Sequence, residues 1–418
     1  MKILWIVNTV FPDLAQILNK EIPIGGGWMY GMAKKMASRP DIQLGIASVH
    51  EDDFLLEEKV NGVSYFLLPN KSKVRYDKKL EDYWESVCDR FNPDIIHIHG
   101  SEYAHGLACL VIRPNLNFVI SIQGIIGPSS RYFLGGMSFT EIFKSLTFRD
   151  LVTLDTLLQQ KFSFIKRSKY EVKYFTNIAN VIGRTDWDFA HSKYVGSTIN
   201  YHFCNETLRD GFYKAVKWDL NKVDRYSIFL SQANYPLKGA HNIIKAAAKL
   251  VTKYPSLKIK IGGHKINRCK SIKDKLKLKG YGKFLNQLIK LHDLENNVEF
   301  LGLLNESQMI AQYQKAHVFI CPSSIENSPN SLGEAQIIGT PVIASFVGGV
   351  ANMVEHNVTG LLYRFEEVEM LSNWVSSIFN NAKLAQTLSE NSIKVAEKRH
   401  DRDENLSKMI SIYNKIVD

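Results

Sequence analysis

The feature of this sequence that most constrains its fold is a regular alternation of short apolar runs with longer amphipathic stretches. Runs with the composition of β-strands recur along the first half, at Ile3–Asn8, Leu44–Ser48, Tyr65–Pro69, Ile95–His99 and Phe118–Ile122. A second series occupies the other half, at Ser227–Ser231, Lys258–Gly262, Val298–Leu301, His317–Cys321, Pro341–Ser345 and Gly360–Tyr363. Strands that alternate with helices form parallel sheets with helices on both faces. We therefore predict an α/β fold of two doubly wound, Rossmann-like domains, with ligands bound in a crevice at the carboxyl ends of the strands.

The length of the chain fits this division, because 418 residues exceed one ordinary domain of ~150 residues. The first domain is predicted over residues 1–195 and the second over residues 226–400. Residues 196–225 are polar and lack clean periodicity, which is typical of a linker. Residues 401–418 are predicted to form a terminal helix.

An apolar and basic insertion at residues 135–175 breaks the alternation within the first domain. Phe139–Phe148 and Leu151–Phe164 have helical patterns, and basic residues are scattered through the segment, at Lys144, Arg149, Lys161, Lys166 and Arg167. Such a composition suits the surface of a membrane. Ordinary core helices with exposed basic residues are the alternative.

The positive charge of the chain is concentrated in one region. Residues 201–300 hold 20 Lys and Arg against 8 Asp and Glu, whereas the whole chain has a net charge of only +10. Lys258–Lys283 contains ten basic residues and a single acidic one, Asp274. A basic stripe can meet nucleic acid, anionic lipid or a phosphorylated substrate, or it can be a solvated helix face.

Several protein classes are excluded by simple features. No run of ~18 apolar residues occurs, so we expect no transmembrane helix. The first apolar run ends at Asn8 and is too short for a signal peptide. The cysteines are odd in number and scattered, at Cys88, Cys109, Cys204, Cys269 and Cys321. We therefore expect neither a disulfide framework nor a cysteine-based zinc site, and a reducing cytoplasm fits best.

Candidate chemistry lies at the segment Glu326–Glu334, after the strand His317–Cys321. A helix is predicted to begin near Ser331. Its first amides and its positive dipole end would favour a phosphate, and the flanking carboxylates could accept hydrogen bonds from sugar hydroxyls. Ser331 and Glu334 also have the spacing of a capping box, so Glu334 could simply cap the helix.

The longer segment Cys321–Tyr363 closely resembles the corresponding part of family 4 retaining glycosyltransferases, which have the GT-B fold. The resemblance is carried by Cys-Pro-Ser-Ser-Ile-Glu326, by Glu334-Ala-Gln-Ile-Ile-Gly-Thr-Pro-Val-Ile-Ala-Ser345, and by Asn-Val-Thr-Gly-Leu-Leu-Tyr363. Ser227–Gly239 and Lys258–Gly263 resemble earlier parts of the same domain. The similarity is strong over residues 225–395 and looser before them, where Pro93-Asp-Ile-Ile-His-Ile-His99-Gly and the glycines at 25–27 carry it.

This resemblance implies roles for individual residues. Glu326 would contact the donor sugar, and Glu334 would hold the ribose of the nucleotide. Lys238 would neutralise the diphosphate, where negative charge builds up on the leaving group. The donor-binding set is completed by backbone around Asn330, Ser331 and Leu332, by Gly263, and by the glycine-rich loop of Gly25, Gly26 and Gly27.

Two departures from the family pattern concern the catalytic residues. The arginine that often precedes the lysine is absent here, and Arg184 is a candidate to replace its charge. Gln123 stands where many relatives have a histidine, so His99, with Glu102 beside it, is the nearer histidine candidate. A surface arginine and a structural histidine are the plain alternatives.

Metal and dinucleotide chemistry are not expected. Asp186-Trp-Asp188 fits the metal-binding pattern of the other major glycosyltransferase fold, but two doubly wound series do not suit that fold, and we predict no metal. The glycines at 25–27 lack the spacing and the position of a dinucleotide-binding fingerprint, which argues against an oxidoreductase.

The sequence as a whole predicts a retaining glycosyltransferase of the GT-B fold, with its two domains facing a central cleft. It would move a hexose-type sugar from a nucleoside-diphosphate sugar to a glycan acceptor, lipid-linked and bound for a bacterial surface polysaccharide. The terminal helix would cross back to the N-terminal domain, as in relatives. We expect no cofactor and no nucleic-acid partner, with a cytoplasmic location that allows peripheral contact with an anionic membrane. A nucleotide-sugar epimerase on the same fold and a non-catalytic binding relative remain alternatives.

Overall fold

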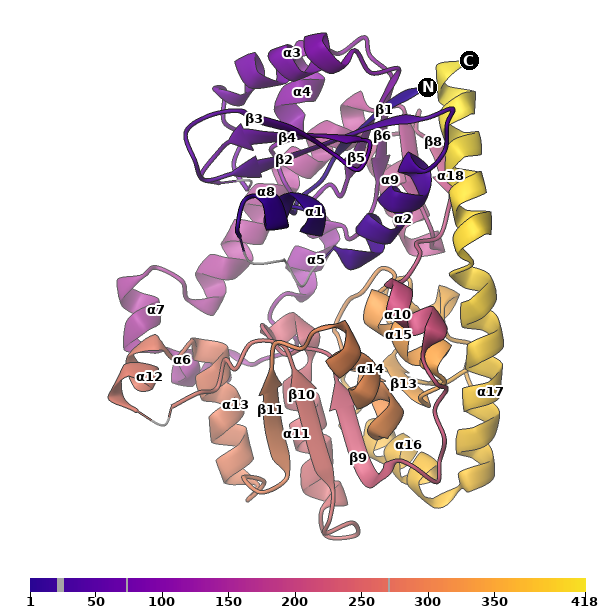
Figure 1. The fold of residues 1–418 in the computed structure, drawn as a ribbon. Helices are drawn as coiled ribbons and strands as arrows, with labels where there is room; N and C mark the ends of the chain where they lie inside the picture. Colours follow the sequence, from indigo (N-terminus) through magenta and orange to yellow (C-terminus); the bar gives the residue numbers. More distant parts are fainter. Residues whose placement is uncertain (21–25, 73, 270) are drawn as a thin grey trace. The chain divides into compact units, whose positions relative to one another are not determined.

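The computed structural model describes residues 1–20, 26–72, 74–269 and 271–418 (Figure 1). These residues form two compact units, each built around one sheet. Unit 1 comprises Met1–Gly127, Phe164–Asp210 and Arg399–Asp418, and unit 2 comprises Pro128–Ser163 and Gly211–Lys398. Within the described ranges, no helix has the length and apolar character needed to span a bilayer.

Unit 1 contains an eight-stranded sheet in the order β3-β4-β2-β1-β5-β6-β7-β8. Its strands are β1 (Lys2–Ile6), β2 (Gln43–His50), β3 (Leu56–Val60), β4 (Val63–Pro69), β5 (Ile95–His99), β6 (Phe118–Ser121), β7 (Asn180–Gly183) and β8 (Asn200–Phe203). Neighbouring strands are parallel except for β3 and β4, which pair antiparallel. The helices are α1 (Pro12–Ile17), α2 (Gly27–Ala37), α3 (Leu80–Phe91), α4 (Leu107–Ile112), α9 (Asp186–Val195) and α18 (Arg402–Val417), while α5 (Ile126–Tyr132) and α8 (Leu157–Asn177) continue from one unit into the other.

The central strands of unit 1 are buried on both faces, which explains their continuous apolar runs. In β1, Leu4 and Ile6 pack in one apolar cluster, and Ile3 and Trp5 pack in another. Because successive side chains of a strand point to opposite faces, this alternation places a core on each side of the sheet. Tyr413 of α18 closes one of these cores, since its hydroxyl accepts a hydrogen bond from the Trp5 indole at 3.0 Å.

Unit 2 contains a six-stranded, entirely parallel sheet in the order β11-β10-β9-β12-β13-β14. Its strands are β9 (Asp224–Leu230), β10 (Lys258–Gly262), β11 (Val298–Gly302), β12 (Ala316–Cys321), β13 (Val342–Ser345) and β14 (Leu361–Tyr363). Its helices are α6 (Phe139–Ser145), α7 (Phe148–Val152), α11 (Ala240–Leu250), α12 (Ile272–Lys277), α13 (Gly280–Leu291), α14 (Glu306–Lys315), α15 (Asn330–Ile338), α16 (Val368–Asn380) and α17 (Ala382–Arg399), with α10 (Asp210–Lys214) at its edge.

The units differ from the predicted domain ranges in two places. The insertion predicted within the first domain lies largely in unit 2, because His241 hydrogen-bonds the carbonyl of Gly135 at 2.8 Å and Lys283 donates to the carbonyl of Leu146 at 2.7 Å. The predicted linker is also partly structured, since β8 extends the sheet of unit 1 by pairing with β7. Residues 399–418, which include α18, belong to unit 1.

Candidate active site

The strand order of unit 2 indicates where a ligand is expected to bind on its sheet. β9, the first strand of the unit, lies between β10 and β12, so the chain winds outward in opposite directions from this point. In open α/β sheets, ligands bind at the carboxyl ends of the strands where this reversal occurs, a position called the topological switch point. The turn after β9 contains Lys238, and the turn after β12 contains Glu326.

Lys238 and Glu326 form an ion pair across this switch point. The Lys238 ammonium lies 2.6 Å from one oxygen of the Glu326 carboxylate, and the two side chains are only 12% and 14% exposed. The hydroxyl of Ser323 donates a hydrogen bond to the same oxygen at 2.7 Å. The Ser323 carbonyl in turn accepts from the hydroxyl of Ser345 at the end of β13. The Glu326 carboxylate is therefore held in a fixed orientation by Lys238 from the turn after β9 and by Ser323 from its own turn.

The electrostatics keep Lys238 charged. Burial disfavours the ammonium ion, but the Glu326 carboxylate outweighs this effect and raises the pKa of Lys238 above its ordinary value. Burial also raises the pKa of the neighbouring Cys321 thiol to about 12, so the thiol stays protonated near neutral pH. The pair thus offers a fixed cation and a fixed hydrogen-bond acceptor at one point of the sheet.

Two glycines allow these turns to approach each other closely. Gly239 has a φ of +69°, and a Cβ there would lie 1.8 Å from the carbonyl oxygen of Pro322. Gly348 has a φ of +51°, and a Cβ there would lie 2.0 Å from the carbonyl oxygen of Glu326. The amide of Gly349 donates to the same carbonyl at 3.0 Å. Backbone contacts from both sides therefore fix the two charged residues.

Glu334 is buried within α15 and does not cap it. The helix begins at Asn330 after Pro329, and no side chain caps its first turn. Ser331 already lies inside the helix, so the capping-box alternative is excluded. The Glu334 carboxylate instead accepts a hydrogen bond from the Tyr313 hydroxyl at 3.2 Å.

The start of α15 is the predicted phosphate-binding position, and only some of its backbone amides can donate to a ligand. The amide of Leu332 donates to the carbonyl of Pro329 at 2.9 Å, so this amide is used within the turn. Asn330 and Ser331 occupy the first two positions of the helix, where amides lack an intrahelical partner. Gly263 follows β10 on the other side of β9, with the amide of His264 directed to the Asn234 side chain at 3.3 Å.

The predicted residues of unit 1 gather at the carboxyl ends of its own strands. His99 ends β5, stacks on His97 at 3.8 Å between ring centroids, and lies 6.0 Å from the ring of Trp28. Within the described residues its two ring nitrogens have no hydrogen-bond partner, and burial lowers the pKa of His99 to about 3. Gln123 follows β6 and donates to the sulfur of Met29 at 3.7 Å.

The glycine-rich loop leads into α2. Gly26 is the residue before the helix, with a φ of +79°, and Gly27 is its first residue. A Cβ on Gly26 would lie 2.7 Å from a methyl group of Thr9, and a Cβ on Gly27 would lie 2.9 Å from the Arg209 side chain. Gly25 lies outside the described residues.

The surroundings of Arg184 argue against its predicted role as a free diphosphate cation. Its guanidinium is 3% exposed, forms an ion pair with Glu206, and donates a hydrogen bond to the carbonyl of Ile122. A buried guanidinium that already has a carboxylate partner holds its own unit together. The sequence could not show this, because Glu206 lies 22 positions away in an irregular segment.

The Asp186-Trp-Asp188 pattern has a local explanation. Thr185 and Asp188 form the capping box of α9, and the Asp188 carboxylate also accepts a hydrogen bond from the Tyr201 hydroxyl. Across the ranges that the structure describes, no group of three or more His, Cys, Asp or Glu side chains is arranged to hold a metal ion.

The sequence indicated Glu102 only as a neighbour of His99, and it contains no signal that marks Ser323 or Tyr313 as part of a site. Burial raises the pKa of the Glu102 carboxyl to about 7, against the hydrogen bonds and the Arg167 charge that lower it. Glu102 lies beside the turn after β5, where a Cβ on Gly100 would come 2.3 Å from its carboxylate. A serine, a tyrosine and a glutamate have no signal of their own until the fold places them beside a candidate residue.

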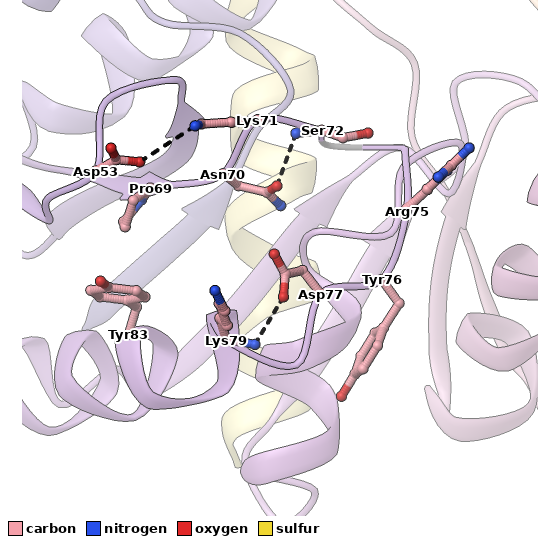
Figure 2. Close-up of a pocket in the computed structure, with 10 residues that line it drawn as sticks. All are labelled: Asp53, Pro69, Asn70, Lys71, Ser72, Arg75, Tyr76, Asp77, Lys79 and Tyr83. Carbon is pink, nitrogen blue, oxygen red and sulfur yellow. Dashed lines mark hydrogen bonds and ion pairs between the residues drawn. The ribbon is translucent and has the colours of Figure 1, made fainter.

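A second candidate site is a polar pocket of about 600 Å³ after β4 in unit 1 (Figure 2). Its basic side chains are Lys71, Arg75 and Lys79, and its aromatic side chains are Tyr76 and Tyr83. Lys71 lies 3.9 Å from the carboxylate of Asp53, whereas among the described residues Arg75 and Lys79 have no acidic partner within ion-pair distance. The pocket therefore suits an anionic or hydroxyl-rich ligand.

Comparison with known proteins gives a family match over unit 2. Residues 214–395 match the family model described as glycosyl transferases group 1. A D-inositol 3-phosphate glycosyltransferase of Corynebacterium urealyticum is 30% identical over 132 residues, which cover 30% of this chain and 28% of that protein. N-acetyl-alpha-D-glucosaminyl L-malate synthase of Bacillus anthracis is 20% identical over 94% of this chain and 95% of that protein. The aligned part thus spans less than a third of the first of these relatives.

Solved structures match the whole chain. Sucrose-phosphate synthase from Thermosynechococcus elongatus has a TM-score of 0.75 at 16% identity, over 100% of this chain and 99% of that chain. HepE of Anabaena, solved with UDP and glucose, has a TM-score of 0.67 at 17% identity, over 99% and 100%. Since these neighbours are GT-B proteins, the predicted fold class is confirmed: the chain has the GT-B fold, with two Rossmann-like α/β domains.

Proposed function

We propose that this protein is a retaining glycosyltransferase that transfers a sugar from a nucleoside-diphosphate sugar to a lipid-linked glycan acceptor in the synthesis of a surface polysaccharide. The observation that carries the proposal is the Lys238–Glu326 pair at the switch point of unit 2, within the segment that matches the group 1 glycosyltransferases. The neighbouring structure solved with UDP and glucose supports a nucleotide-sugar donor. We place the reaction at the cytoplasmic side of a membrane.

In this proposal, each residue would contact a separate part of the donor. Lys238 would leave Glu326 to neutralise the diphosphate, and the freed carboxylate would accept a hydrogen bond from a sugar hydroxyl. As the bond between the anomeric carbon and the diphosphate breaks, the acceptor oxygen bonds to that carbon on the same face. The acceptor proton passes to the departing phosphate oxygen, so no protein base is required. Charge on the leaving group is stabilised by the fixed ammonium ion.

The proposal can be tested with the purified full chain. Thermal shift against a panel of nucleotide sugars identifies the donor, since a ligand at ~100 times its Kd adds about 2.7 kcal/mol of stability. Release of nucleoside diphosphate is then measured with and without a lipid-linked acceptor, and NMR of the product gives the anomeric configuration. Turnover without acceptor to an isomerised sugar nucleotide would indicate an epimerase, and binding without turnover a non-catalytic relative. Because Lys238 supplies the cation, we expect turnover to persist in excess chelator.

Replacing Glu334 should weaken nucleotide binding. For Glu334→Gln we expect the Kd of the nucleoside diphosphate to rise about tenfold or more, because hydrogen bonds to a charged group contribute ~1.5–3 kcal/mol. Isothermal titration with the nucleoside diphosphate measures it. Tyr313→Phe is the matched control, because it removes the hydroxyl bound to Glu334 but keeps the carboxylate. An unchanged Kd for Glu334→Gln would remove this residue from the donor site.

The pocket after β4 is proposed to bind the acceptor. Replacing both Arg75 and Lys79 with alanine should raise the KM for an anionic acceptor about 30-fold, because two charge-assisted contacts of ~1 kcal/mol each are lost. The KM for the donor should stay unchanged. Lys59→Ala, at an exposed position of β3, controls for the loss of surface charge. Equal acceptor KM values in both variants would show that the pocket does not contact the acceptor.

A further inference from the structure

Unit 2 exposes a dense group of large apolar side chains on α6 and α7. Phe139 and Phe143 of α6 are 85% and 76% exposed, and Phe148 of α7 is 72% exposed. Leu151 and Val152 continue the same surface along α7 and expose more than half of their area. Single exposed apolar residues are ordinary, but a contiguous apolar patch of this kind marks an interaction surface.

This exposure follows from firm packing of the opposite helix faces. Ile142 and Ser145 of α6 are buried, Glu141 pairs with Lys245 at 3.3 Å, and the carbonyl after the helix accepts the hydrogen bond from Lys283. In α7 the buried residue is Asp150. Apart from Ile142, the helices thus bury polar or small side chains and expose their aromatic side chains, the reverse of an ordinary surface helix.

The helix α12 adds to the same surface from a distant part of the chain. It contacts α7, it has no buried residue, and Ile272 and Leu276 are 78% and 56% exposed. A capping box formed by Ser271 and Asp274 fixes its start. Figure 1 shows α6, α7 and α12 grouped at one side of unit 2. We call the exposed surface of α6, α7 and α12 the apolar platform.

The platform carries a positive charge with little to balance it. The nearby carboxylates are already engaged, since Asp155 pairs with Arg149 at 2.9 Å and Asp274 pairs with Arg268 at 3.1 Å. In the part of the chain that the structure describes, no ion pair is formed by the lysines of the platform, Lys144, Lys273, Lys275 and Lys277. A surface of exposed phenyl rings among unpaired lysines is complementary to an anionic bilayer, whose headgroups lie above hydrocarbon.

A pocket of about 480 Å³ opens on the platform beside α6. Its walls are mainly apolar, and Lys144 is the one charged residue among the described residues that line it; the lining residues are Phe139, Thr140, Ile142, Phe143, Lys144, Leu146, Thr156 and Leu158. An apolar cavity next to a single ammonium group matches a lipid, whose hydrocarbon chain would fill the cavity while its anionic headgroup meets Lys144.

We propose that the apolar platform docks unit 2 on an anionic lipid bilayer and that the pocket beside α6 takes one hydrocarbon chain of an anionic lipid. The proposal rests on the proposed function in one respect, since a lipid-linked acceptor would bring the substrate to the same surface. The bilayer contact itself does not depend on catalysis.

Vesicle sedimentation of the full chain tests the bilayer contact. We expect the protein to sediment with phosphatidylglycerol vesicles and not with phosphatidylcholine vesicles. Phe139→Ser with Phe143→Ser should lower the partition coefficient at least tenfold at low and high salt. Lys273→Gln, Lys275→Gln and Lys277→Gln together should lower it mainly at low salt, because salt screens exposed charges.

Matched control variants test whether the loss of binding is specific to the platform or follows from removing any exposed phenyl ring or surface charge. Phe54→Ser removes an exposed phenyl ring from unit 1, and a triple glutamine variant at Lys383, Lys394 and Lys398 removes three exposed charges from α17. Both controls should sediment like the natural protein. Equal sedimentation of the platform variants and the controls, or equal binding to both vesicle types, would overturn the proposal. So would a platform variant that changes only the oligomeric state, because that result would indicate a protein partner.

A separate fluorescence experiment tests whether the pocket beside α6 takes a hydrocarbon chain of a lipid. A tryptophan at position 143 (Phe143→Trp) should be quenched by lipids brominated on the acyl chain, while Phe54→Trp should not be. Absence of quenching would overturn the pocket assignment. Donor binding and transfer to a water-soluble acceptor should be unchanged in the Phe139/Phe143 variant. If no donor is ever bound, the proposed function fails while the sedimentation result still decides the platform.

Discussion

Replacing Glu326 with glutamine is expected to lower the rate of sugar transfer by about 100-fold or more, while the nucleoside diphosphate still binds. The amide keeps the shape of the side chain and can still accept from Ser323 and Lys238. It loses the negative charge that pairs with Lys238 and that is proposed to bind the sugar. Removing one fixed electrostatic contact to a transition state typically costs 10²–10³ in rate. Steady-state kinetics and titration with the nucleoside diphosphate give the two quantities.

An exposed glutamate of the same unit provides the control. Glu366→Gln changes the same charge near a surface arginine 3.9 Å away, and its rate should match that of the natural protein. A Glu326→Gln enzyme with a near-normal rate would show that the ion pair at the switch point only holds two turns together. Weakened nucleotide binding in this variant, with an unchanged rate when saturated, would move Glu326 from the sugar to the nucleotide.

Replacing Gly239 with alanine is expected to destabilise unit 2 by about 3 kcal/mol or more. The added Cβ would meet backbone atoms of Pro322 at 1.8 and 2.7 Å, so no side-chain rotation can relieve the clash. Overpacking typically costs 1–3 kcal/mol, and a left-handed φ adds about 1–2 kcal/mol for a residue with a Cβ. For a unit of this size we expect the Tm to fall by roughly 10 °C, as measured by thermal unfolding.

The variant Gly62→Ala is the control, because it measures the cost of a left-handed backbone without a steric clash at the added Cβ. Gly62 also has a positive φ, of +83°, but among the described residues beyond its two chain neighbours no heavy atom lies within 4 Å of its Cβ position. Gly62→Ala should therefore cost only about 1 kcal/mol. If both variants melt at the same temperature, the turns after β9 and β12 are not in the close contact that positions Lys238 and Glu326.

Strands were predictable where their burial was complete. Ala316–Cys321 of β12 is buried at every position, and its apolar run was recognised to within one residue. β8 escaped prediction, because Asn200–Phe203 is an edge strand with no fully buried residue and therefore no apolar signal. The function of a single polar residue was less predictable still, since both roles of Glu334 fitted the sequence until the helix start at Asn330 excluded the cap.

By itself, the sequence determined the two Rossmann-like domains and the turns that contain Lys238 and Glu326, because burial patterns and strand–turn–helix signals are local. Only the tertiary structure decided which of the predicted charged residues are free to bind a ligand and which are already paired within the protein. It paired Arg184 with Glu206, and it separated the two ends of the basic stripe. Lys260, in the middle of β10, pairs with Asp224 at the start of β9, while α12 contacts α7 in the apolar platform. Side chains that lie far apart in the sequence become neighbours only through packing, and no local pattern records such a contact.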